Sequence, residues 1–170
     1  MKELLDKLSS YNIFNYLFPG IVFCFLSKEV AGYQLLSSDI VTGVFFYYLM
    51  GLIISRIGSI IIEPLFKKLT IVKFSTYSDF LNAANKDPKI ELLSENNNMF
   101  RTLISLFFLL IVFKAFFILE QGCPIVKNYR WLIISMILLV LFALSYRKQT
   151  KYIVDRVNSI NIKEKNSWAL

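Results

Sequence analysis

The chain has 170 residues, of which 56% are hydrophobic and only 18% are charged. A soluble chain carries about 25% charged and about 45–50% apolar residues, so this composition excludes disorder and disfavours an ordinary soluble globule. The chain has no His and only two Cys. It therefore lacks the commonest general base and metal ligand, and it has too few thiols for a disulfide scaffold or a Cys-rich metal site.

The first apolar segment, residues 11–31, contains the stretch IFNYLFPGIVFCFL. Asn15 and the pair Pro19-Gly20 interrupt it, but a membrane helix tolerates proline when neighbouring groups satisfy the freed carbonyl. We expect a kinked membrane span here, with a re-entrant or interfacial helix as the alternative. A signal peptide is disfavoured because the basic residues before the segment are balanced by acidic ones and no small-residue cleavage site follows.

Three further segments are apolar over most of the roughly 20 residues that a membrane helix needs. Their few charged residues, Arg56, Arg101 and Lys114, lie within about two turns of a span end, from which long side chains reach the headgroups. The predicted spans are residues 40–62, 99–119 and 131–146. Together with the first segment they predict an all-α integral membrane protein, with four transmembrane helices in a single domain.

The basic residues between the spans predict the orientation. The N-terminal tail, the loop at residues 64–98 and the tail at residues 147–170 together hold thirteen Lys and Arg, whereas the other two loops hold three. Because cytoplasmic flanks are enriched in Lys and Arg, both termini and the 64–98 loop are expected in the cytoplasm of a bacterial inner membrane. The net charge of +7 is then mostly topological, and no direct nucleic-acid binding is expected.

The 64–98 loop has helical signals of its own. We expect Pro64 to end the second span and residues 65–74, which mix apolar residues with lysines, to lie on an anionic membrane surface. A short helix should begin at residues 78–79. Asp87-Pro88 is a helix start, and no helix breaker follows before Gly122, so one long helix is predicted from the loop through the third span.

Polar residues before and inside the third span recur at helical spacing, which places them on one helix face. Two interpretations remain open. The polar groups could form hydrogen bonds and ion pairs between helices, with Arg56 reaching the inner headgroups. Alternatively, they could line a water-accessible path that conducts or gates, in which Glu95 and Arg56 would be coupled. The polar seam comprises the residues of this face, together with charged residues near the same interface; these are Glu91, Glu95, Asn98, Thr102 and Ser105 on the face and Arg56, Glu63 and Arg101 beside it.

Small residues in the second span predict close helix packing. Gly51, Ser55 and Ser59 recur every four residues, a spacing that lets two helices approach closely, within the chain or between copies. A four-span chain of this length buries little surface by itself, so we expect a homo-oligomer, a cytoplasmic partner protein, or both, beside the lipid bilayer. Cys24 and Cys123 are expected to be unpaired thiols.

The motifs of common enzyme families are absent. The sequence contains no phosphate-binding loop, dinucleotide fingerprint, HExxH or nucleophile elbow. Without His, neither a Ser–His nor a Cys–His nucleophile system can be built from this chain. A secondary transporter is disfavoured because the sequence shows no two-halves symmetry. We therefore expect a non-enzymatic protein without a cofactor or metal.

The overall plan resembles the small multi-pass membrane components of bacterial antiphage defence systems, among them the membrane subunit of Kiwa and the transmembrane effectors of retron and CBASS systems. The resemblance rests on chain length, four spans, inward termini and a structured loop; the segments YNIFNYLFPG and DPKIELLSENNNMFRT look specific to a family. It implies a membrane-permeabilising effector, or a membrane anchor or sensor for a cytoplasmic partner. An immunity protein against a pore-forming bacteriocin and a scaffold or regulatory subunit of a larger membrane complex are the alternatives.

Overall fold

The computed structural model describes the backbone of residues 12–167 and the side chains of residues 12–159. All regular structure in this part of the chain is helical, which confirms the predicted all-α class. The elements are two π-helices, η1 (Ile13–Leu17) and η2 (Gly58–Ile62), and six α-helices: α3 (Phe18–Ala31), α4 (Ile40–Ile57), α5 (Glu63–Lys68), α6 (Tyr77–Ala84), α7 (Lys89–Gly122) and α8 (Pro124–Ser167). The N-terminal tail and Tyr11, where the first span was predicted to begin, lie outside the described residues.

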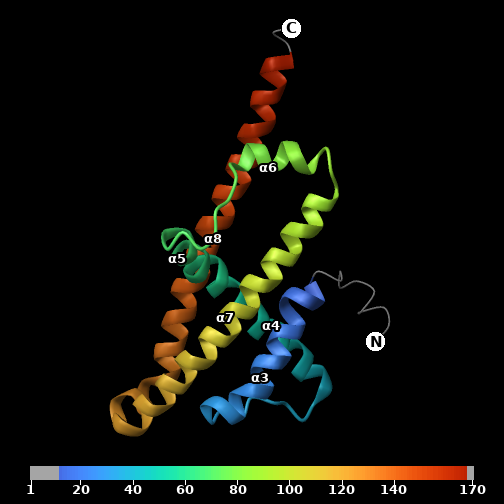
Figure 1. Ribbon diagram of the computed structural model, residues 1–170. Coiled ribbons are helices and arrows are strands. Elements are labelled where there is room, and N and C mark those ends of the chain that lie inside the picture. Colours follow the sequence, from blue (N-terminus) through green and yellow to red (C-terminus); the bar gives the residue numbers. More distant parts are fainter. Residues whose placement is uncertain (1–11, 168–170) are drawn as a thin grey trace.

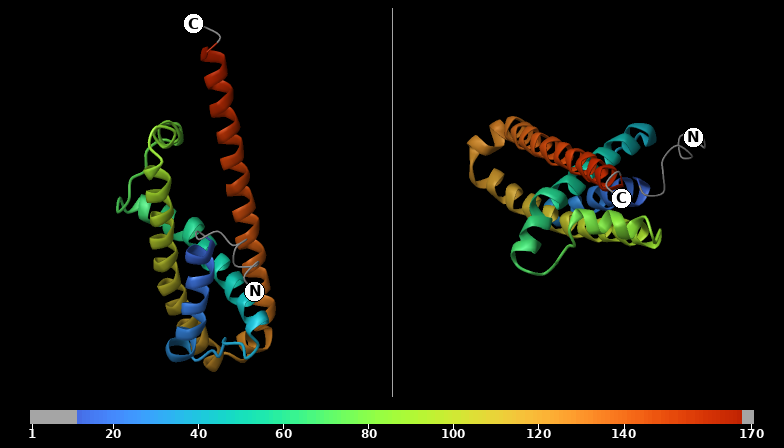
Figure 2. Two further views of the ribbon diagram at one scale, coloured as in Figure 1. Left: turned by 90° about the vertical axis from the view of Figure 1, so that its right-hand side faces the viewer. Right: turned by 90° about the horizontal axis from the view of Figure 1, so that it is seen from above.

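The four long helices α3, α4, α7 and α8 run alternately in opposite directions (Figures 1 and 2). Residues 32–39 join α3 to α4, and Cys123 alone joins α7 to α8, at the same end of the molecule. We call this the turn end; the opposite end, which carries α6 and the last turns of α8, is the α6 end. Thr76 caps α6 by accepting a hydrogen bond from the backbone N–H of Asp79. The carboxylate of Asp87 accepts one from the N–H of Lys89, where α7 begins.

Four helical segments are long and apolar enough to cross a membrane: Ile13–Ala31, Ile40–Lys68, Lys89–Gly122 and Pro124–Ser159. Each contains one of the four predicted spans, apart from residues 11 and 12 of the first. The first runs as a helix through Pro19-Gly20 without a turn. Two boundaries differ from the prediction: the second helix continues beyond Pro64 to Lys68, and the connection before the fourth shrinks to Cys123.

The two π-helices explain how the chain stays helical through proline. Each ends two residues before one: η1 precedes Pro19 and η2 precedes Pro64. In η1 the N–H of Phe18 donates to the carbonyl of Ile13, five residues back, and η2 ends in the same way. Proline lacks an N–H and its ring crowds the preceding turn, so a wider turn just before it leaves room for the ring. The helix therefore continues through Pro64. The prediction that the second span ends at this proline is wrong.

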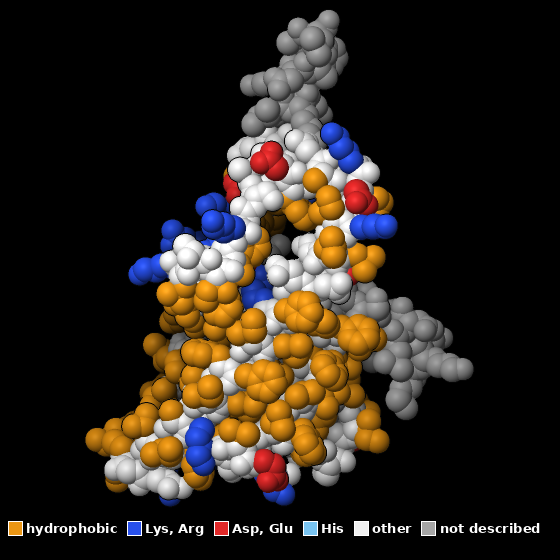
Figure 3. All heavy atoms as spheres, in the orientation of Figure 1, with side chains coloured by type: hydrophobic (Ala, Val, Ile, Leu, Met, Phe, Trp, Pro, Cys, Tyr) orange, Lys and Arg blue, Asp and Glu red, His pale blue; other side chains and the backbone are white. Residues whose placement is uncertain are grey.

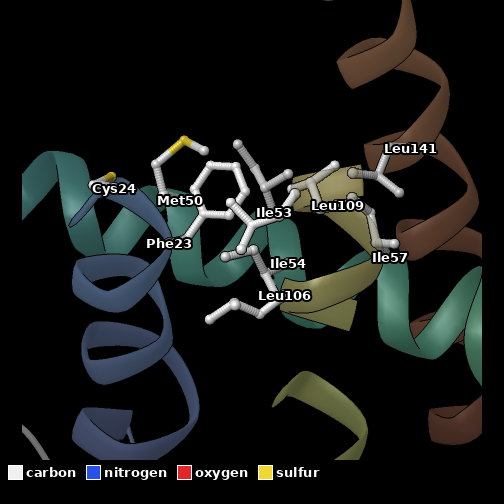
Figure 4. Close-up of a cluster of buried hydrophobic side chains, with 10 residues drawn as sticks. Phe23, Cys24, Met50, Ile53, Ile54, Ile57, Leu106, Leu109 and Leu141 are labelled. Atoms are coloured by element: carbon white, nitrogen blue, oxygen red, sulfur yellow. The ribbon is translucent and has the colours of Figure 1, made fainter. Parts of the chain in front are cut away.

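Two glycines let the first two spans touch backbone to backbone. A Cβ placed on Gly20 would collide with the carbonyl of Tyr47, and one placed on Gly51 would collide with the carbonyl of Tyr16. Glycine at such a contact lets two helix axes lie closer together than they could with a larger residue there. Around this contact a hydrophobic cluster from α3, α4, α7 and α8 fills the centre of the molecule (Figure 4); its buried members include Phe23, Ile54, Leu106 and Leu141.

The outer surface is strongly apolar over the middle of the molecule. Figure 3 shows a broad belt of hydrophobic side chains, with charged side chains gathered above and below it. In α8 only 6% of the apolar window is buried inside the chain, so most of the apolar surface of this helix is open to its surroundings. A belt of this kind is what a hydrocarbon environment covers.

Candidate functional site

A buried carboxylate lies where the apolar belt meets the α6 end. Among the described residues, three cationic side chains contact Glu63, whose side chain is only 8% exposed. Arg101 Nη1 donates to Glu63 Oε2 over 2.6 Å. Lys67 Nζ and Lys148 Nζ lie 2.9 Å and 3.3 Å from Oε1. We call these four residues the Glu63 cluster; it joins α5, α7 and α8 through a single acidic group.

The buried face of the second span ends at Glu63 and places its side chain in this position. Gly51, Ser55, Ser59 and Glu63 follow one another at intervals of four, and all four are buried. In a regular α-helix each interval of four rotates the side chain by about 40°. The wider turn of η2 reduces this rotation, so Glu63 stays on the face that Ser59 occupies. The carbonyl of Ser59 in turn accepts a 2.6 Å hydrogen bond from Lys148 Nζ.

The hydroxyl groups of the polar seam on α7 are turned inward and satisfied locally. Thr102 and Ser105 are fully buried. Thr102 donates to the carbonyl of Asn98 and Ser105 to that of Arg101, both one turn back on their own helix. A Cβ on Gly58 would come within 2.5 Å of Ser105 Oγ, so the second span packs tightly against this part of α7. In the single chain, this segment is a packed helix contact.

Three other members of the polar seam take no part in the ion pairs of the Glu63 cluster in the described part of the chain. Glu91 and Glu95 are exposed on the first turns of α7, and Arg56 is half-buried in α4. No ion pair joins Arg56 to Glu95 in the described part of the chain. The coupling of these two residues, which the second interpretation of the seam implied, therefore does not rest on a direct ion pair; the ion pairs described here belong to Glu63, seven residues after Arg56.

The absence of an ion pair between Arg56 and Glu95 predicts that their substitutions act independently. Arg56→Ala and Glu95→Ala should each have its own effect on stability and function. The double variant should change stability by the sum of the two single effects to within about 0.5 kcal/mol, as uncoupled sites do. The measurement is a double-mutant cycle on unfolding in mild detergent. A coupling energy above about 1 kcal/mol would show that the two side chains meet after all.

Two cations of the cluster had a different interpretation at the sequence level. The sequence places Lys67 in the 65–74 segment expected on an anionic membrane surface, and it places Lys148 among the topological charges of the C-terminal tail. Lys148 in fact continues a buried face of α8 that includes Leu141 and Ser145. The spacing of these three positions, four and then three residues, was the available signal. The sequence could not supply the partner, because Lys148 and Glu63 are 85 residues apart.

A second buried carboxylate, Glu120, was not predicted. It lies at the turn end, is 8% exposed, and accepts a 2.6 Å hydrogen bond from the hydroxyl of Tyr33. Arg130 Nη1 lies 3.9 Å from its other oxygen. Cys24 is fully buried, Cys123 is partly exposed, and both are free thiols.

No group of three or more metal-ligating side chains forms among the described residues. No protein family, curated protein or solved structure matches the chain. The functional argument therefore rests on the arrangement of its own residues.

Proposed function

We propose that this protein is a non-enzymatic, four-span component of a bacterial inner membrane that anchors a cytoplasmic partner protein at its α6 end. In this proposal both termini and the segment at residues 64–98 are cytoplasmic, as the distribution of Lys and Arg favours. By the resemblance described above, the assembly belongs to an antiphage defence system. The permeabilising effector is the competing form of the same proposal.

One observation carries the preference for an anchor. Four members of the polar seam have partners inside the single chain: Glu63 pairs with Arg101 and two lysines, and Thr102 and Ser105 donate to their own helix. A path for ions requires polar groups that face water. The described surface beyond the belt, by contrast, includes charged and apolar side chains that are exposed.

That surface combines charge with apolar side chains. On the first turns of α7, Glu91 and Glu95 are exposed beside Leu92 and Leu93, which are 63% and 65% exposed. The final half of α8 stands beyond the belt as a single helix (Figures 1 and 2). Charged groups interleaved with apolar ones suit a surface that binds a protein partner.

The test of the anchor is expression in a bacterial host, with and without the neighbouring genes, while membrane potential and dye entry are recorded. We expect intact membranes when the chain is expressed alone. Photo-crosslinkers at Leu92 and Leu93 should capture a product of a neighbouring gene, and phage plaques should fall only when both proteins are present. Depolarisation by the chain alone would favour the effector, and protection against a bacteriocin without any partner would favour an immunity protein.

The native cysteines test the orientation. A membrane-impermeant maleimide applied to intact spheroplasts should label Cys123, because the turn end faces outward in this proposal, whereas the fully buried Cys24 should stay unlabelled. Cys123→Ser should abolish the signal and serves as the control. Labelling that appears only after the membrane is permeabilised would mean that the turn end is cytoplasmic, which would overturn the proposed side of the docking surface.

A further inference from the structure

The turn end contains a recess that none of the preceding roles uses. Two adjoining hollows of about 600 and 360 Å³ lie beside the joint between α7 and α8, and Glu120, Gln121 and Lys127 line both. Tyr33 and Arg130 also line the smaller one. We call these five residues the recess. One acidic and two basic side chains therefore face a space large enough for a small polar molecule.

The carboxylate of the recess has unused hydrogen-bonding capacity. Glu120 Oε2 accepts the hydrogen bond from Tyr33, but buried Oε1 accepts none in the described part of the chain. Arg130 Nη1, at 3.9 Å from Oε1, is an ionic neighbour beyond hydrogen-bond distance. Buried carboxylate oxygens are normally paired, so Oε1 is a position for an N–H donor that the chain does not supply.

The surroundings hold this carboxylate in place. Gly32 adopts a φ of 80° at the end of α3, a conformation that glycine adopts without strain, and Tyr33 follows it. The Tyr33 ring packs edge-on against Phe113 and Phe117, with centroids 5.7 and 5.5 Å away. Burial and the Glu120 carboxylate raise the pKa of the Tyr33 hydroxyl above its ordinary value. The hydroxyl thus stays protonated at neutral pH and keeps donating to Oε2, which leaves Oε1 for a ligand.

The basic side chains of the recess are donors for an anionic group, whereas Glu120 is an acceptor for a cationic one. Lys127 and Arg130 are the residue types that bind phosphate oxygens. A fixed carboxylate beside two cations complements a ligand that carries a primary ammonium and a phosphate a few bonds apart. The next residue, Trp131, is 69% exposed and Tyr129 is 57% exposed, and such aromatic residues concentrate at the headgroup level of a bilayer.

We propose that the recess binds a phosphate zwitterion with a primary ammonium, and that its source is the headgroup of phosphatidylethanolamine. The ammonium donates to Glu120 Oε1, and the phosphate oxygens accept from Lys127 and Arg130. Free phosphoethanolamine has the same chemistry. The exposed apolar and aromatic side chains around the recess favour the lipid.

Trp131 provides the readout. Its ring lies 5.2 Å from the guanidinium of Arg130, and Trp168→Phe leaves it as the sole tryptophan of the chain. The full chain is reconstituted in nanodiscs that contain a small fraction of lipid with brominated tails, which quench tryptophan fluorescence on contact. Brominated phosphatidylethanolamine, phosphatidylcholine and phosphatidylglycerol are compared. We expect about tenfold preferential quenching by phosphatidylethanolamine over phosphatidylcholine, whose quaternary ammonium has no N–H to donate.

Variants of the recess test separately the proposed recognition of the ammonium by Glu120 and of the phosphate by Lys127. Glu120→Gln should reduce the preference over phosphatidylcholine to about twofold or less. Lys127→Ala should weaken both lipids equally, because they share the phosphate. Tyr33→Phe removes the hydrogen bond to Oε2 but retains Oε1, so it should keep the preference, and Lys114→Ala, on α7 but outside the recess, is the matched control for a lost lysine charge.

Two results with the Trp168→Phe protein, which retains every recess residue, would overturn the proposal without depending on the stability of any recess variant. Equal quenching by all three lipids would mean that the recess does not read headgroups. Strongest quenching by phosphatidylglycerol would mean that it reads negative charge and has no ammonium site. Added phosphoethanolamine is expected to leave the quenching unchanged; displacement of the lipid at micromolar concentration would overturn the lipid as the source.

Discussion

Gly51→Ala should lower the free energy of unfolding by about 3 kcal/mol, although alanine normally stabilises a helix interior relative to glycine by roughly 0.5–1 kcal/mol. The sign reverses because the new methyl group would occupy the position of the Tyr16 carbonyl. Backbone atoms in a helix cannot move aside individually, so the first two spans must separate and their shared packing is lost. The cost lies at the upper end of the range for overpacked cores.

The measurement is reversible unfolding by SDS in mixed micelles, followed by circular dichroism. Gly20→Ala should behave like Gly51→Ala, since its Cβ would meet the Tyr47 carbonyl. Gly122→Ala is the matched control, because nothing lies within 4 Å of the Cβ position there; its stability should be unchanged or slightly higher. Equal stability of the Gly51 and Gly122 variants would refute the close contact between the first two spans.

The Glu63→Gln variant should lose about 2–4 kcal/mol of stability. This change keeps the shape of the side chain but removes the charge that compensates Arg101, Lys67 and Lys148. Removing one partner of a buried ion pair costs about 3–5 kcal/mol. The expected loss is somewhat smaller here, because the three cationic side chains keep 22%, 46% and 26% of their surface exposed and water screens part of their repulsion.

A second substitution tests whether uncompensated charge is the cause. Adding Lys148→Met to Glu63→Gln should recover about half of the loss, because it removes one of the cations left without an acidic partner. Glu91→Gln, which removes an exposed carboxylate on α7, should stay within about 0.5 kcal/mol of the native protein. Were Glu63→Gln as stable as Glu91→Gln, the cluster would contribute nothing to the fold.

The sequence predicted the helices better than it predicted the contacts between them. Hydropathy is summed over a whole segment, so four apolar helices could be recognised even with Arg56 or Lys114 inside them. The long helix from residue 89 followed from the Asp87-Pro88 start and the absence of a breaker before Gly122. The spacing of Gly51, Ser55 and Ser59 marked the buried face of the second span, and that face continues to Glu63.

The pairing of charges was not predictable in the same way. It depends on how each helix is rotated about its own axis, and η2 changes that rotation between Arg56 and Glu63. In the described part of the chain, Arg56 and Glu95 form no ion pair, and Glu63 pairs instead with Arg101, Lys67 and Lys148. Glu120 and Tyr33 are 87 residues apart, and neither belongs to a periodic pattern, so only the fold brings them together.

The one-residue connection at Cys123 has a mechanical consequence. The 44 residues of α8 extend about 66 Å from it, so a tilt of only 5° at this pivot carries the far end of the helix through about 6 Å. Glu120 and Lys127 flank the pivot at distances of three and four residues. A ligand bound in the recess, as proposed above, would act on the short arm of a lever whose long arm reaches the α6 end.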